Sequence, residues 1–175
     1  MIREKLDNAI REVPDFPKPG ILFKDITPIF LDQQLCSEIV DELAKQTKNL
    51  HLDAIIGIES RGFFFGILLA NKLQIPFIPI RKKGKLPYKT VSYEYELEYG
   101  FAEVEMHQEV IQKGWNVLIH DDLLATGGTA AAAAELVVMQ EANVVGFSFV
   151  VELKFLNGTE KLEKYTKNRF NLISY

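Results

Sequence analysis

The chain is organised around the stretch Val117-Leu118-Ile119-His120-Asp121-Asp122-Leu123-Leu124-Ala125-Thr126-Gly127-Gly128-Thr129. Its opening apolar run predicts a buried strand. Two adjacent carboxylates follow at the end of that strand, then a Thr-Gly-Gly-Thr turn, then strong helix formers from Ala130 to Met139. The N–H groups of the turn and the N-terminus of the helix predict a binding site for one phosphate. Because carboxylates repel phosphate, Asp121 and Asp122 suit ribose hydroxyls or Mg²⁺ beside it.

Two better-known phosphate loops are excluded at this position. A P-loop needs a lysine and then Ser or Thr after its last glycine, whereas Thr129 and Ala130 follow Gly128. The dinucleotide-binding pattern Gly-x-Gly-x-x-Gly occurs nowhere in the chain. An ordinary strand-to-helix turn is the remaining alternative, but adjacent acids followed by Ala-Thr-Gly-Gly-Thr favour the phosphate site.

Composition indicates one soluble domain. The chain has 175 residues, of which 47% are hydrophobic, and this is enough for one proper core. A net charge of −4 gives no argument for binding to nucleic acid or membrane. Cys36 shares the apolar face of a helix with Ile39 and Leu43, so we expect it in the core of a protein from a reducing compartment. The start of the chain has no apolar leader segment, and the run Gly62 to Ala70 is too short to cross a bilayer, so we expect a cytoplasmic protein.

The N-terminal part predicts a helix followed by a stiff loop. Apolar residues at helical spacing predict an amphipathic helix over Ile2 to Val13. The segment Asp15 to Pro28 contains three prolines and one glycine, which exclude a regular helix. A stiff loop can hold Phe23 and Lys24 in place to stack on a flat heterocycle and read its edge. The alternative is a surface loop with a buried phenylalanine.

A helix over 35–48 precedes a second strand, turn and helix. Asp53 to Ile58 is apolar on both faces, as strands of parallel sheets are. Glu59-Ser60-Arg61-Gly62 follows as the turn, and Phe63 to Leu73 as an apolar helix. Arg61 therefore stands at the carboxyl end of a strand, where open α/β sheets bind ligands, and its guanidinium suits a pyrophosphate. The alternative for Arg61 is a surface ion pair.

The next segment combines a basic run with an alternating one. Pro76 to Ile80 predicts a strand, and Arg81-Lys82-Lys83-Gly84-Lys85 places four cations at its end. Charge runs are usually solvated, but this position favours a polyanionic ligand. Thr90 to Tyr99 and Ala102 to Met106 alternate on either side of Gly100, which predicts a β-hairpin. With acids along one face, this hairpin is expected to be a flexible lid, and the alternative is a plain antiparallel pair.

The remaining elements complete an α/β domain. Val144 to Val151 predicts a core strand, Asn157 to Tyr165 a short charged helix, and Phe170 to Tyr175 a terminal strand or tail. We therefore expect a mostly parallel sheet with helices on both faces, in a single domain over 1–175. A small N-terminal hood takes in about residues 1–34, and the basic loop with the hairpin lid about residues 81–106.

Five motifs, in this order, resemble those of adenine phosphoribosyltransferases, a branch of the type I phosphoribosyltransferase family. They are Phe16 to Pro28, Glu59 to Phe63, Arg81 to Pro87, Leu97 to Gly100 and Asp121 to Thr129. The last one resembles the family's signature for 5-phosphoribosyl 1-pyrophosphate (PRPP). The resemblance implies the reaction adenine + PRPP ⇌ AMP + pyrophosphate, a purine salvage step that uses Mg²⁺, usually in a homodimer.

The resemblance also implies roles for individual residues. The PRPP- and AMP-binding residues are Asp121, Asp122, Ala125, Thr126, Gly127, Gly128 and Thr129. The pyrophosphate-binding residues are Glu59, Ser60, Arg61, Arg81, Lys82 and Lys85. Phe23 and Leu123 would sandwich adenine, with the backbone around Leu22 and Lys24 reading its edge. Glu98 would be the acid/base partner, helped by Tyr99, and Arg61 would be catalytic as well as binding pyrophosphate. No side chain is expected to bind metal directly, since Mg²⁺ would be held through PRPP, pyrophosphate and water.

One departure and two rival functions remain at this stage. His120 stands where the family commonly has an aliphatic residue, and we expect a tolerated strand residue rather than a role in the site. A type I enzyme for hypoxanthine, guanine or orotate is the nearest rival, but the segment Phe16 to Pro28 argues against it. A PRPP-sensing regulator that binds nucleic acid is the other, and an acidic chain of this length leaves no room for a DNA-binding domain.

Overall fold

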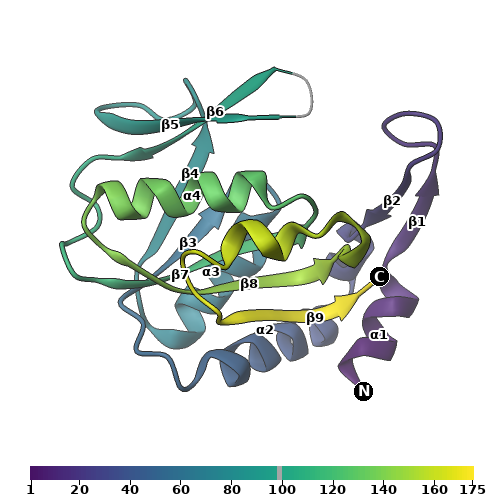
Figure 1. Cartoon of the computed structure of the whole chain (residues 1–175). Coiled ribbons are helices and arrows are strands. Elements are labelled where there is room, and N and C mark those ends of the chain that lie inside the picture. The colour runs from purple at the N-terminus through teal and green to yellow at the C-terminus, as the bar shows by residue number, and fades with distance from the viewer. Residues whose placement is uncertain (98–99) are drawn as a thin grey trace.

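The computed structural model of the chain describes residues 1–97 and 100–175 (Figure 1). The helices are α1 (Ile2–Ala9), α2 (Gln33–Thr47), α3 (Gly62–Leu73) and α4 (Gly128–Met139), with 3₁₀ turns η1 (Thr27–Leu31), η2 (Lys154–Leu156) and η3 (Gly158–Leu162). The strands are β1 (Arg11–Pro14), β2 (Leu22–Asp25), β3 (Ala54–Ile58), β4 (Phe77–Lys82), β5 (Thr90–Glu96), β6 (Phe101–His107), β7 (Asn116–Leu124), β8 (Asn143–Glu152) and β9 (Arg169–Ser174). Glu98 and Tyr99, the predicted acid/base pair, lie outside the described residues.

Seven of the described strands form one sheet in the order β5-β6-β4-β3-β7-β8-β9. The five strands β4, β3, β7, β8 and β9 run parallel to one another, which confirms the predicted α/β class. The hairpin β5–β6 adds to this sheet in antiparallel fashion through β4. Because the chain passes from β3 to β4 on one side and from β7 to β8 on the other, the strand order reverses between β3 and β7. Ligands of open α/β sheets bind at the carboxyl ends of the strands beside such a reversal.

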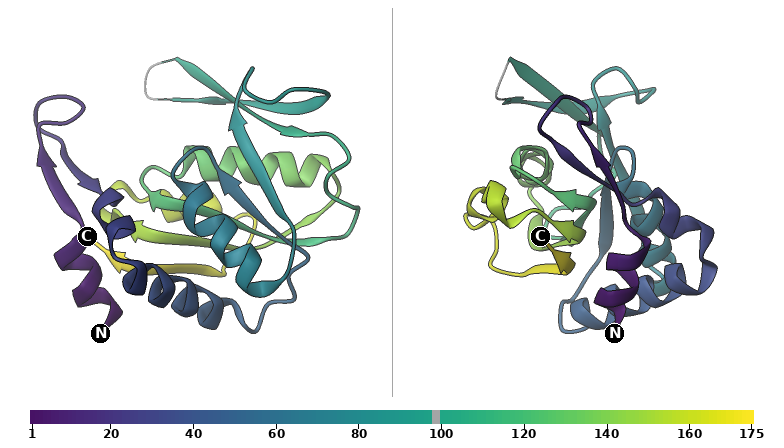
Figure 2. Two further views of the ribbon diagram at one scale, coloured as in Figure 1. Left: turned by 180° about the vertical axis from the view of Figure 1, so that it is seen from behind. Right: turned by 90° about the vertical axis from the view of Figure 1, so that its right-hand side faces the viewer.

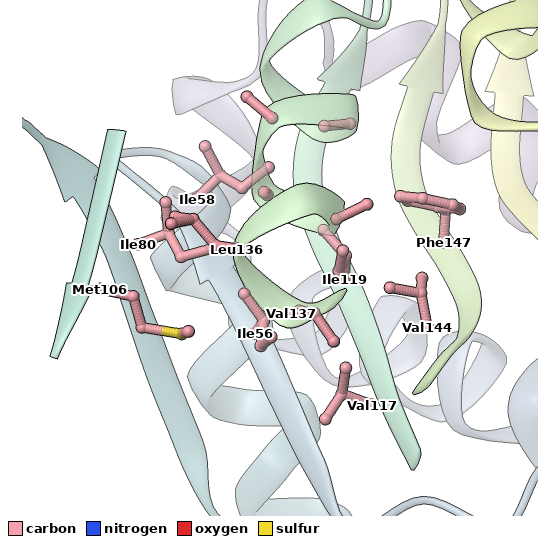
Figure 3. Close-up of a cluster of buried hydrophobic side chains, with 14 of the residues drawn as sticks. Ile56, Ile58, Ile80, Met106, Val117, Ile119, Leu136, Val137, Val144 and Phe147 are labelled. Carbon is pink, nitrogen blue, oxygen red and sulfur yellow. The ribbon is translucent and has the colours of Figure 1, made fainter. Parts of the chain in front are cut away.

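Each face of the sheet carries its own hydrophobic core. Helix α4 covers one face, where its alanines allow close approach to residues such as Ile56, Ile119 and Phe147 (Figure 3). Helices α1, α2 and α3 cover the other face, over Ile55 and Leu118. Burial of apolar side chains on both faces explains why β3 has no polar face. The two cores fix the strand ends that carry the predicted site.

The N-terminal hood differs from the prediction in its elements. The first helix ends at Ala9 rather than Val13, because Ile10 is already extended, and Arg11–Pro14 instead pairs with Leu22–Asp25. The segment predicted as a loop therefore contains the strand β2 and the 3₁₀ turn η1. Its prolines are compatible with this pairing, because Pro17 and Pro19 stand between the two strands and Pro28 stands in η1. An ion pair of 2.6 Å between Arg11 and Asp25 closes the base of this hairpin.

Two hairpins project from the body of the molecule. Figure 2 shows the β1–β2 arm and the β5–β6 hairpin rising beyond the sheet on the same side. At the other end of the chain, the helix predicted over 157–165 is only the short turn η3, which packs against α4. None of the helices within 1–97 and 100–175 is long and apolar enough to cross a membrane.

Candidate active site

A cleft of about 400 Å³ opens at the carboxyl ends of β3, β4 and β7. It collects the predicted pyrophosphate residues from two turns and the acidic pair from a third segment. Its lining residues are Ile58, Glu59, Ser60, Arg61, Ile80, Arg81, Lys82, Lys85, Tyr95, Val104, Asp121, Asp122, Leu123 and Thr129. The structure thus brings together cations and carboxylates that are separated in the sequence.

A smaller hollow of about 80 Å³ lies over the glycine turn. It is lined by the whole turn from Ala125 to Thr129, and it shares Asp121, Leu123 and Thr129 with the larger cleft. Helix α4 begins here, with Gly127 as its N-cap. The unpaired N–H groups and positive end of the helix dipole make this hollow suited to an anion.

The glycine turn is packed against a distant segment of the chain. Gly127 has a left-handed backbone (φ +78°), and a Cβ atom there would lie 2.3 Å from the carbonyl oxygen of Gly158. A Cβ atom on Gly158 would in turn lie 2.2 Å from the carbonyl oxygen of Ala125. We expected Gly127 to let a phosphate approach the backbone; the structure adds that it must also pack on Gly158. Gly158 was not among the predicted site residues.

The acidic pair lies inside β7, which ends at Leu124, and not at the end of the strand as predicted. β7 continues to Leu124 because its pairing with β8 continues beyond the acids. Asp122 is therefore buried, with Oδ2 2.8 Å from Nε of Arg61, while Asp121 is half-buried and faces the cleft. The Asp121 carboxylate accepts a hydrogen bond from the amide of Asp122 at 2.9 Å. Burial, and then the neighbouring charge of Asp122, raise the pKa of Asp121 well above its usual range.

Arg61 links the acidic pair to the hood. Its side chain is 34% exposed, so the ion pair with Asp122 is an ion pair in the cleft and not the surface pair considered as an alternative. The guanidinium carbon also lies 5.2 Å from the ring centre of Phe23, within the range of a cation–π contact. Arg61 is thus held on two sides at the mouth of the cleft.

The basic loop is held in place by carboxylates. Glu59 accepts two hydrogen bonds from Arg81, both of 3.2 Å, and one of 2.9 Å from the amide of Lys82. Although burial alone would raise the pKa of Glu59, these bonds and the cations beside it lower that pKa. In this geometry the Glu59 carboxylate positions the loop. Lys82 and Lys85 line the cleft, and the ammonium group of Lys85 lies 3.7 Å from Glu59.

The predicted adenine-binding residues lie on the hood and on β7. Leu123 lines both hollows, whereas Leu22, Phe23 and Lys24 line neither. Phe23 packs edge-on against Phe16, with ring centres 5.1 Å apart, and reaches the cleft through Arg61. The ammonium group of Lys24 pairs with Glu12 and lies 3.7 Å from the ring centre of Tyr175. Any contact of residue 24 with a base would therefore come from its backbone.

Two residues of the hairpin reach the site although they were not predicted to do so. The Tyr95 hydroxyl lies 3.0 Å from the hydroxyl of Thr129 and thus joins the hairpin to the glycine turn. Glu105 is buried and accepts hydrogen bonds from the basic loop. Strict alternation was the available signal, but it places several acids on one face and several tyrosines on the other without distinguishing among them.

His120 lies in β7 directly before the acidic pair and lines neither hollow. It is fully buried, and Nδ1 lies 2.7 Å from the hydroxyl of Ser148. Burial lowers its pKa to about 4, so the ring is neutral at physiological pH. This environment fits the expected strand residue without a role in the site.

Known proteins share both the sequence and the fold. The sequence profile described as "Phosphoribosyl transferase domain" matches residues 29–174. The adenine phosphoribosyltransferase of Cytophaga hutchinsonii is 49% identical over 175 residues, covering 100% of this chain and 97% of the relative. The crystal structure of adenine phosphoribosyltransferase from Thermoanaerobacter pseudethanolicus superposes with a TM-score of 0.95 at 46% identity, and 100% of each chain is covered. That of Saccharomyces cerevisiae, complexed with an imino-altritol bisphosphate and adenine, has a TM-score of 0.89 at 43% identity, with 95% of this chain and 97% of that chain covered.

Proposed function

The chain belongs to the adenine phosphoribosyltransferases, and we propose that the cleft after β3, β4 and β7 is where it carries out their reaction. The protein transfers the 5-phosphoribosyl group from PRPP to adenine, giving AMP and pyrophosphate. The observation that carries the placement is the cleft itself. Its lining combines the carboxylate pair with a set of cations. It also shares Asp121, Leu123 and Thr129 with the smaller hollow over the glycine turn.

The phosphate hollow and the acidic pair would hold the part of PRPP that is transferred. The N–H groups from Ala125 to Thr129 and the start of α4 would bind the 5-phosphate. Asp121 lines both hollows, so its carboxylate would meet the ribose hydroxyls beside that phosphate. Asp122 is buried against Arg61. Its carboxylate would therefore orient the Arg61 side chain as well as contact the ribose.

The cations of the cleft would stabilise the leaving pyrophosphate. As N9 of adenine bonds to C1 of the ribose, the bond from C1 to the pyrophosphate oxygen breaks and negative charge grows on the leaving group. Arg61, Lys82 and Lys85 line the cleft and would face the charge as it develops, and fixed charges in a partly enclosed site are the main source of such stabilisation. Ser60 stands between these groups and would add a backbone donor. Arg81 is paired with Glu59, so its main role would be to hold the shape of the loop and not to bind the anion.

Mg²⁺ fits this site as a companion of the phosphate groups. Among the described residues, no group of three or more His, Cys, Asp or Glu side chains is arranged to hold a metal ion. Burial and then the charge of Asp122 raise the pKa of Asp121, and a hydrated cation on pyrophosphate would favour its ionised form. Mg²⁺ would neutralise charge on the pyrophosphate, and Asp121 would reach it through water.

Base recognition is assigned to the hood. The family profile begins at residue 29, so the β1–β2 arm lies outside the part of the chain that it matches. Phe23 on that arm and Leu123 on β7 are the apolar surfaces that would enclose adenine. Glu98 would take the N9 proton, with Tyr99 beside it. A Glu98→Gln variant that turns over as fast as Glu96→Gln, an exposed acid of the same hairpin, would remove this role.

We also propose a homodimer formed through the outer face of α3. Four large apolar side chains, 43% to 90% exposed, gather on α3 and on the adjoining turn η1: Leu31, Phe64, Ile67 and Leu68. Phe64 is joined to η1 by an edge contact with Phe30, with ring centres 4.9 Å apart. An exposed apolar helix face of this kind is suited to an identical face on a second copy. Sedimentation should give a dimer that Ile67→Glu dissociates, and an unchanged dimer would exclude this face.

The activity is tested by product analysis with competing bases. The protein is incubated with PRPP and MgCl₂ together with adenine, hypoxanthine, guanine or orotate, and nucleotide formation is followed in a single turnover. We expect AMP from adenine at a rate far above that of any other nucleotide. Consumption of another base in preference to adenine would contradict the assignment of the hood. Binding of PRPP without consumption of any base would instead indicate a sensor.

A further inference from the structure

A buried acid that no predicted role explains lies against the basic loop. Glu105 lies on β6, directly opposite Arg81 of β4 in the antiparallel pair, and is only 2% exposed. A buried carboxylate beside a loop that binds an anion is unfavourable unless its charge is fully satisfied. Its surroundings therefore indicate what it does.

Glu105 accepts its hydrogen bonds from the returning half of the basic loop. Oε1 accepts from the amide of Lys85 at 2.9 Å and from the amide of Leu86 at 2.8 Å. Oε2 accepts from the hydroxyl of Thr90 at 3.3 Å. Hydrogen bonds from backbone N–H groups to an ionised acceptor are among the stronger ones in proteins, so the carboxylate fixes the loop at this point.

The same peptide is held from its other side. The guanidinium of Arg81 donates to the carbonyl oxygen of Lys85 at 3.1 Å, while its remaining nitrogens donate to Glu59. Between them, the loop turns back through Gly84, whose backbone is left-handed (φ +83°). The main chain of Lys85 is therefore fixed at both its N–H and its carbonyl group. Its side chain lines the cleft, where the ammonium group lies 3.7 Å from the carboxylate of Glu59.

We propose that Glu105 is a positioning residue that holds the main chain of Lys85 and Leu86, so that the Lys85 ammonium group faces the pyrophosphate of PRPP. The amides bound by Glu105 are withdrawn from the anion, and recognition of pyrophosphate is left to side-chain cations. This inference rests on the proposed function, because it assumes that pyrophosphate binds in the cleft.

The test compares two ligands in three variants. Glu105→Ala removes all three hydrogen bonds, and Glu105→Gln keeps an oxygen that accepts from the loop amides. Glu103→Gln is the matched control, because Glu103 is a partly exposed acid of the same strand that pairs with Lys83 of the same loop. Calorimetry measures binding of AMP, and of pyrophosphate with MgCl₂, and the melting temperature of each variant is recorded.

We expect Glu105→Ala to weaken pyrophosphate binding by about tenfold or more, the worth of one to two hydrogen bonds to a charged group, with AMP affinity nearly unchanged. Glu105→Gln should recover most of this loss, and Glu103→Gln should bind both ligands like the parent. Equal losses for both ligands, or no loss in a folded Glu105 variant, would overturn the positioning role. If the parent protein itself forms no AMP from adenine and PRPP, the proposed function fails instead. The two failures are thus distinguishable.

Discussion

The glycine turn Ala125–Thr129 and the basic loop Arg81–Lys85 are the two regions proposed to bind phosphate groups, but they are built differently. The turn offers backbone N–H groups at the start of α4, and its shape is set by the close packing of Gly127 on Gly158. The loop offers ammonium and guanidinium groups, and its shape is set by Glu59 and Glu105. The first has almost no freedom to adjust, while the second carries long side chains.

This difference suits what happens to the 5-phosphate and to the pyrophosphate during the reaction. The 5-phosphate stays with the ribose from PRPP to AMP, so a rigid site made of backbone groups suits it throughout the reaction. The pyrophosphate gains charge as it leaves and must then be released. Side-chain cations respond to that charge and can move with the product. The comparison therefore makes different predictions for substitutions in the two regions.

The largest effect is expected from Gly127→Val. A branched side chain there would meet the carbonyl oxygen of Gly158 and would also be strained by the left-handed backbone. We expect AMP binding, measured by calorimetry, to fall by about 100-fold or more, the upper range for overpacking a tight site. Gly114→Val is the control, because Gly114 has a similar φ of +82° with open space around it. Equal losses of AMP affinity in the two variants would mean that a general destabilisation of the fold, and not the packing of Gly127 on Gly158, causes the loss.

An intermediate effect is expected from Asp121→Asn. The amide retains the hydrogen bond from Asp122 but cannot match a carboxylate towards ribose hydroxyls, so PRPP affinity should fall by about tenfold. The stability of the protein should change in the opposite direction at pH 7. Since the native pKa of Asp121 is raised above its ordinary value of 3.8, ionisation at neutral pH costs stability, and that cost is absent below pH 3.8.

Thermal unfolding of Asp121→Asn and the parent over a range of pH checks this second effect. The variant should melt at a higher temperature near pH 7, and the difference should shrink as the pH falls towards 3.8. A variant that is less stable than the parent at pH 7 would show that the Asp121 charge is already compensated in the empty protein.

A smaller difference between the two regions is expected in how strongly salt weakens the binding of their ligands. Raising the ionic strength from about 0.05 M to about 0.5 M screens exposed charges. Pyrophosphate binding, at constant MgCl₂, should weaken by about tenfold, because it depends on exposed ammonium groups. AMP binding to backbone donors should weaken by less than about threefold. Identical salt dependence for the two ligands would argue against a division between backbone and side-chain recognition.

The sequence predicted the strands of the main sheet, the helices α2, α3 and α4, and the glycine turn, because the period of apolar residues and the glycine signature are local properties. It did not predict that Asp122 is buried, because this depends on how far β7 pairs with β8. The hood hairpin was missed for the same kind of reason: Arg11–Pro14 becomes a strand only by pairing with Leu22–Asp25. Likewise, Gly158 acquires its importance from the packing of η3 on a turn that lies far away in the sequence.

Glu105 illustrates the limit for the site. Alternation placed Glu103 and Glu105 on the same face of a strand, and nothing local separates them. The antiparallel pairing of β6 with β4 sets Glu105 beneath the basic loop, while Glu103 pairs with Lys83 at the surface. The composition of the basic loop was therefore predictable, but the group that shapes it was not.

The most direct test of the two-region account is a binding matrix of Gly158→Ala and Lys85→Met against AMP and pyrophosphate with MgCl₂. Gly158→Ala should weaken AMP binding by about tenfold, through the contact with the Ala125 carbonyl, and leave pyrophosphate binding near the parent value. Lys85→Met should do the reverse, with a loss of about tenfold for pyrophosphate and little change for AMP. If each variant loses both ligands to the same extent, the cleft acts as a single site and the division of labour proposed for its two anion-binding regions is wrong.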